Sequence, residues 1–68
     1  MKIPSQFPFR IEVWSRDGSR LEETIAASSS LHIAIAAFDA ACLARPAETV
    51  MLCNLAQIIR KRDPAACI

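Results

Sequence analysis

The stretch LHIAIAAFDAACLAR, residues 31–45, decides what kind of fold this chain can form. It is rich in alanine, contains neither Gly nor Pro, and is followed at once by Pro46, a residue that ends helices. The preceding Ser28-Ser29-Ser30 offers hydroxyl groups that can cap a first helical turn. We therefore predict a helix over about residues 30–45.

Apolar side chains surround this predicted helix almost completely. One face carries a core stripe at helical spacing: Leu31, Ala34, Ile35, Phe38, Ala41 and Cys42. The other face has only His32 and Asp39 as strongly polar residues, and Ile33, Leu43 and the alanines Ala36, Ala37, Ala40 and Ala44 fill the rest. A helix that is apolar nearly all round is normally covered nearly all round. We therefore expect the alanine face to contact a second protein chain.

Before the helix, the sequence FPFRIEVWS at residues 7–15 alternates apolar and polar residues with a period of two, which predicts a strand. Asp17-Gly18 then indicates a turn, and a second extended run follows over residues 19–26. A three-residue loop at residues 16–18 matches the apolar faces best. It predicts that Val13 lies opposite Leu21, Phe9 opposite Ile25, and Trp14 beside Arg20.

Residues 48–62 fit two structures. As a hairpin, they turn at Asn54-Leu55 and pair Met51 with Ile58. As a helix, they present Met51, Leu52, Leu55, Ile58 and Ile59 as one apolar stripe. The pattern alone slightly favours the helix.

A resemblance to other proteins bears on the choice between a hairpin and a helix. It rests on FRIEVW at residues 9–14, Asp17-Gly18, AAFDAA at 36–41 and VMLCNLAQII at 50–59. Over about residues 7–62 the chain resembles a group of small uncharacterised bacterial proteins with the element order ββαββ. In that group the last segment commonly reads as a β-hairpin turning at a Gly, where this sequence has Leu55. The resemblance implies a fold and no activity.

We therefore expect a single α+β domain over residues 7–62, with an N-terminal hairpin, a central helix and a C-terminal hairpin. The alternative is ββαα, with residues 48–62 helical. We expect residues 1–6 and 63–68 to be disordered tails. A chain of 68 residues buries only about 60% of its unfolded surface, so self-association would supplement a small core.

Composition excludes several classes of protein. The net charge of +1 gives no strong attraction to nucleic acid or anionic membrane. Cys42, Cys53 and Cys67 form no C-x-x-C pair, so we expect reduced thiols, no metal and no cofactor in a cytoplasmic protein. Nothing approaches the roughly 20 apolar residues of a membrane span, and the N-terminus has no signal-peptide pattern.

Candidates for catalysis are weak. His32 and Asp39 are seven residues apart on the predicted helix, about 10 Å along its axis, which is too far for a direct hydrogen bond. Cys53 could be exposed near Arg60 at a hairpin tip, where a nearby cation would make the thiol reactive. Glu12 could meet Glu22 on one sheet face. None of these forms a connected catalytic set, and we expect no enzymatic activity.

Two sets of residues could bind a partner. One is Trp14 with Arg10 and Arg20, a combination of residue types that is common at the centre of protein interfaces. The other is the alanine face of the helix. We expect an interaction module that forms a homodimer or binds another protein. The alternative is a weak nucleic-acid-binding protein, a less favoured class, which would use the basic residues Arg16, Arg60, Lys61 and Arg62. The sequence identifies no small-molecule ligand.

Overall fold

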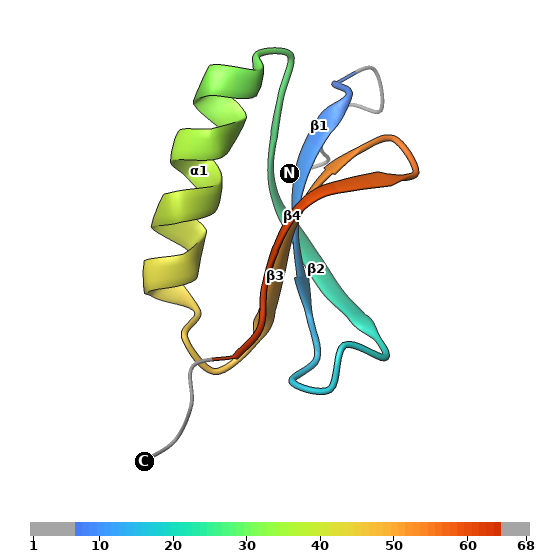
Figure 1. Ribbon diagram of the computed structural model, residues 1–68, viewed down its shortest axis with the longest axis vertical. Coiled ribbons are helices and arrows are strands. Elements are labelled where there is room, and N and C mark those ends of the chain that lie inside the picture. Colours follow the sequence, from blue (N-terminus) through green and yellow to red (C-terminus); the bar gives the residue numbers. More distant parts are fainter. Residues whose placement is uncertain (1–6, 65–68) are drawn as a thin grey trace.

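The computed structural model describes residues 7–64 and contains four strands and one helix in that range (Figure 1). They are β1 (Phe9–Trp14), β2 (Leu21–Ser28), α1 (Leu31–Ala44), β3 (Thr49–Asn54) and β4 (Gln57–Arg62). The predicted α+β class and ββαββ order are confirmed, and the alternative of a second helix over residues 48–62 is wrong. Residues 1–6 and most of the C-terminal tail lie outside the described residues.

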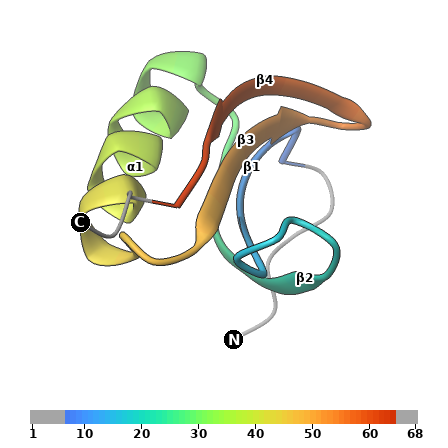
Figure 2. The same ribbon diagram turned by 60° about the horizontal axis from the view of Figure 1, so that its bottom comes forward.

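The strands form an antiparallel sheet in the order β2-β1-β3-β4. The two central strands, β1 and β3, come from opposite halves of the chain and lie side by side. Helix α1 packs against one face of the sheet (Figure 1). Seen from its end, the sheet is curved, with its concave side turned away from α1 (Figure 2). We call this second side of the sheet the outer face.

Helix α1 begins and ends where the sequence predicts. Ser30 is extended, and its hydroxyl accepts a hydrogen bond from the backbone N–H of Ile33, which caps the first turn. The last carbonyls of a helix lack partners within it. Here Arg62 of β4 supplies one for Cys42 in the last turn, and it also donates to the carbonyl oxygens of Arg45 at the C-cap and of Glu48 in the following loop. The C-terminal strand is thereby attached to the end of the helix.

The core lies between α1 and the sheet. Ile11, Val50 and Leu52 from the central strands pack against Ala34, Phe38 and Ala41 of the helix. Ile35 and Cys42 are partly buried beside them, as the predicted stripe requires. Leu31 is the exception, because it sits in the first turn and remains exposed.

The predicted pairing of β1 with β2 is wrong. Val13 lies opposite Glu23 and Phe9 opposite Ser28, so Trp14 faces Leu21 and Glu12 faces Thr24. The physical reason is a longer connection, residues 15–20, together with two bulges in the ladder. The Asp17 carboxylate organises this loop by accepting hydrogen bonds from the Ser15 hydroxyl and from the backbone and hydroxyl of Ser19. These bonds, that of Ser15 first, lower the pKa of Asp17 to about 2.

The predicted C-terminal hairpin is present, but it turns one residue later than the sequence indicated. Asn54 pairs with Gln57, so the turn residues are Leu55 and Ala56, and Met51 pairs with Lys61 instead of Ile58. Leu55 has a φ of 56°, in the left-handed region that Gly occupies without strain. Its backbone N–H donates to the carbonyl of Pro8, which holds the turn against the start of β1.

Candidate interaction surfaces

A polar cluster lies on the outer face, centred on Glu12. The Glu12 side chain accepts hydrogen bonds from Arg10 Nε at 3.1 Å, from Trp14 Nε1 at 3.1 Å and from Cys53 Sγ at 3.6 Å. Strand alternation explains the grouping, because residues 10, 12 and 14 share one face of β1 and Cys53 lies opposite Arg10 on β3. Glu12 is only 8% exposed, so these donors take the place of water around its charge.

Cys53 is not the exposed thiol that the sequence suggested. It is 5% exposed, and its hydrogen bond runs to Glu12, with Ile58 instead of Arg60 as its partner on β4. Burial, followed by the nearby Glu12 carboxylate, raises the pKa of the thiol to about 11. A thiolate is the reactive form of cysteine, so Cys53 stays in its unreactive protonated form at neutral pH.

The three residues of the predicted sheet-face interface have different environments. Arg10 and Trp14 are drawn together by Glu12, and Arg10 also donates to the carbonyl of Leu55 at 2.9 Å. Arg20 is separate from them: it lies in the loop before β2 and its guanidinium pairs with Glu22 at 3.5 Å. Trp14 and Arg10 therefore already donate hydrogen bonds within the chain.

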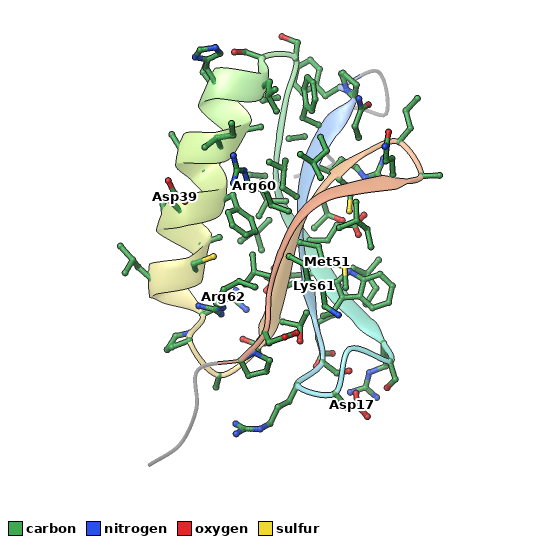
Figure 3. The ribbon with its side chains drawn as sticks, in the orientation of Figure 1. Asp17, Asp39, Met51, Arg60, Lys61 and Arg62 are labelled. Atoms are coloured by element: carbon green, nitrogen blue, oxygen red, sulfur yellow. The ribbon has the colours of Figure 1, made fainter. Side chains whose placement is uncertain are left out.

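The basic residues of β4 point in different directions (Figure 3). Arg60 and Arg62 extend toward α1, where Arg62 caps the helix, while Lys61 lies on the outer face opposite Met51. Lys61 also pairs with Asp63 at 3.7 Å. Arg16 lies in the loop after β1, where its carbonyl accepts a hydrogen bond from the Thr49 hydroxyl at the start of β3. These cations do not form one continuous basic surface.

The face of α1 turned away from the sheet is largely apolar and exposed. Leu43 is 85% exposed and Ile33 64% exposed, and Ala36, Ala40 and Ala44 are exposed between and beside them. Of the predicted alanines, only Ala37 is partly buried, since it packs against the core. We call Ile33, Ala36, Ala40 and Leu43 the helix seam.

The sequence prediction placed Ile33 and Leu43 on this face but named only the alanines as contact residues, although the two large residues dominate the seam. Their spacing was the available signal: positions 33, 36, 40 and 43 follow the three-four-three pattern of one helix face. The buried residues Ala34, Phe38 and Ala41 lie on the opposite side of the helix, so the seam faces outward.

The free edges of the sheet are β2 and β4. Edge strands can pair with other chains unless bulges, charges or short length prevent it. Both edges carry such features, because Glu22 and Ile25 are extra residues in β2, and Ile59 is an extra residue in β4 next to Arg60 and Lys61. The edges are poorly suited to adding a strand.

Residues 7–64 provide no group of three or more side chains that could hold a metal ion. His32 and Asp39 are both exposed on α1, two turns apart. Within the described range, no helix combines the length and the apolar character that crossing a membrane requires. Comparison of the sequence with protein-family models and with curated proteins, and of the structure with solved structures, finds no match.

Proposed function

We propose that this protein is a non-enzymatic interaction module that self-associates through the outward face of α1. The observation that supports this most strongly is the exposure of Leu43 and Ile33 on one side of a helix. Single exposed apolar residues are common on protein surfaces, but two large ones aligned with alanines form a continuous apolar strip.

Burying this strip is favourable for a simple reason. Full burial of a Leu or Ile side chain gives about 1.5–3 kcal/mol, and a symmetric contact buries two of each. Ala36 and Ala40 lie between them and allow another helix to come close, toward the short end of the 8–10 Å range of helix packing. The second copy thus supplies apolar area that a chain of this length lacks.

Other surfaces offer less. The bulges discourage pairing at the sheet edges, and Glu12 already engages Trp14 and Arg10 on the outer face. The nucleic-acid alternative requires cations on a common surface, whereas Arg62 is used to cap α1, and Arg60 and Lys61 extend to opposite sides of the sheet (Figure 3). Among the described residues, the helix seam is an apolar surface without a role inside the molecule, and it includes Leu43, the most exposed large apolar side chain.

The contact should be transient. A single pair of short helices buries less than the roughly 1,200 Å² at which stable interfaces begin. Association also costs translational and rotational freedom, which a small interface only partly offsets. We therefore expect a monomer–dimer equilibrium that responds to protein concentration.

Sedimentation equilibrium from micromolar to millimolar protein tests the proposal. The average mass of the natural chain should rise toward that of a dimer, and the double variant Ile33→Gln, Leu43→Gln should remain monomeric. Leu55→Gln is the matched control, because Leu55 is as exposed as Ile33 but lies on the hairpin tip. A natural chain that stays monomeric, or a control that dissociates like the double variant, contradicts the proposal.

A further inference from the structure

We infer that β4 is a strap that opens and closes over the edge of β3, and that Arg62 is the latch that holds it closed. When the strap opens, the β3 edge and the buried thiol of Cys53 become accessible while the rest of the domain stays folded. This inference does not depend on the self-association proposed above.

Strand β4 contributes little to the interior of the domain. The buried core cluster and the partly buried residues packed against it include no residue of β4. Residues 57–61 are exposed, and the two large apolar side chains among them, Ile58 and Ile59, remain 53% and 39% exposed. Segments with few buried apolar contacts open at a lower free energy than the core does. β4 can therefore leave the sheet without removing a residue from the core.

The pairing of β4 with β3 is also weakened at two places. The turn between them holds Leu55 at a φ of 56°, a left-handed conformation that is unfavourable for a residue other than Gly. Ile59 is an extra residue that interrupts the ladder between Leu52 and Cys53. A contact at the far end of β4 therefore has a large share in keeping the strap closed.

Arg62, the last residue of β4, makes that contact. Its Nη1 donates to the carbonyl of Cys42 at 2.7 Å, and its Nη2 donates to the carbonyls of Arg45 and Glu48. Hydrogen bonds from a charged donor are roughly twice as strong as those between neutral groups. One side chain thus attaches the end of β4 to the end of α1 and to the loop that follows it.

The acceptors of the latch are held in place independently of it. Arg45 pairs with Glu23 of β2 at 2.6 Å and with Glu48 at 3.4 Å, and neither ion pair involves Arg62. The latch itself is incompletely bonded, because Arg62 Nε is buried with no hydrogen-bond partner among the described residues. Leaving a buried donor without a partner is unfavourable, which limits the stability of the closed form and makes opening accessible.

Cys53 reports on the state of the strap. It lies on β3 opposite Ile58 of β4, and it is 5% exposed and bonded to Glu12 in the closed form. Opening removes β4 from one side of the thiol and leaves the β3 backbone groups without their partners. Because alkylation requires an accessible thiol, the rate of labelling at Cys53 measures the population of the open form.

Native-state amide hydrogen exchange, measured by NMR where reclosing is faster than exchange, tests the strap. In the natural chain, amides of β4 should exchange at least about tenfold faster than those in the middle of α1. Phe38→Leu weakens contacts that survive in the open form. It should therefore accelerate exchange in α1 by about tenfold and leave β4 unchanged. If Phe38→Leu accelerates β4 as much as α1, β4 opens only when the whole domain unfolds and the strap is overturned.

The role of the latch is tested by Arg62→Gln, with Lys61→Gln as the control that removes the same charge from the neighbouring residue. Arg62→Gln should accelerate exchange in β4 by about tenfold or more, whereas Lys61→Gln should change it by less than about twofold. Arg62→Lys keeps the charge but donates through one nitrogen. It should give an intermediate rate, and it replaces Arg62→Gln if that variant fails to fold. Equal acceleration by Arg62→Gln and Lys61→Gln, or by neither, overturns the latch.

Access to Cys53 is tested by labelling with iodoacetamide in a chain carrying Cys42→Ala and Cys67→Ser, which leaves one native thiol. Arg62→Gln should raise the labelling rate of Cys53 by the same factor as the exchange rate of β4, and Lys61→Gln should not raise it. If exchange in β4 accelerates but labelling does not, β4 does not control access to the thiol, and that part of the inference is overturned.

Discussion

The centre of the sheet is buried on both faces, but by different means. On the side of α1, Ile11 and Leu52 are covered by the apolar helix residue Phe38. On the outer face, Met51 and Cys53 are also buried, although their neighbour at the centre is the acidic side chain of Glu12. A chain with one helix can cover only one face of its sheet with secondary structure. On the other face, the centre is covered by side chains of the sheet itself.

This difference predicts different sensitivities to mutation. Apolar packing loses stability roughly in proportion to the atoms removed and the cavity left behind. A buried polar cluster responds to whether each remaining group still has a partner. On the helix-covered face, the loss of stability on mutation should therefore increase with the volume of side chain removed. On the outer face, it should depend on whether the new side chain can still form the hydrogen bonds.

The largest expected effect is on the helix-covered face. Phe38→Ala removes most of the side chain that joins α1 to the sheet and should lower the free energy of unfolding by about 3–5 kcal/mol. Urea unfolding followed by Trp14 fluorescence measures the change. Phe38→Leu keeps much of the volume and should cost about 1–1.5 kcal/mol. Equal losses for the two variants contradict the view that volume decides stability on this face.

A smaller loss is expected on the outer face. Glu12→Ala leaves Trp14 Nε1 and Cys53 Sγ without their acceptor and should cost about 2–3 kcal/mol. Glu12→Gln retains an acceptor oxygen of similar shape and should cost about half as much, in the same urea assay. Glu22→Ala, on an exposed carboxylate, is the control and should change stability by less than about 0.5 kcal/mol. Equal effects of Glu12→Ala and Glu12→Gln would show that hydrogen bonding does not hold this face together.

The sequence predicts the helix and the element order because these depend on local patterns. Residues 31–45 combine helix-forming composition with a capping serine and a terminating proline, and α1 follows them closely. The registers of the hairpins depend on side-chain bonds within the turns. The Asp17 carboxylate lengthens the first loop, and no hydrophobic pattern reports that. The second turn places Leu55 at a left-handed position, against the preference of its residue type.

The candidate surfaces were predictable to a similar degree. Alternation alone places Arg10, Glu12 and Trp14 on one face, but the pairing with β3 is needed to bring Cys53 beside Glu12. The outward face of α1 follows from helical periodicity. The high exposure of Leu43 on this face follows only from the position of the sheet, which partly covers the neighbouring Cys42 and leaves Leu43 exposed.

The smallest expected change in stability is an increase, and it concerns the β3–β4 turn beside the outer face. The carbonyl of Leu55 accepts a hydrogen bond from Arg10, the same side chain that pairs with Glu12, so the turn is attached to the polar cluster. This attachment holds Leu55 in a left-handed conformation that costs a non-Gly residue about 1 kcal/mol. Leu55→Gly should therefore raise the free energy of unfolding by about 0.5–1 kcal/mol, after allowance for the greater flexibility of glycine in the unfolded chain.

Ala56→Gly is the matched control, because Ala56 occupies the second turn position and is not among the residues with positive φ. The same replacement should lower stability there by about 0.5–1 kcal/mol, since glycine adds unfolded-state entropy and relieves no strain. Paired urea titrations of the two variants give the comparison directly. Destabilisation by both changes would mean that the Leu55 side chain contributes more to the hairpin tip than its backbone conformation costs. The contacts that stabilise the outer face would then include the Leu55 side chain as well as the Glu12 cluster.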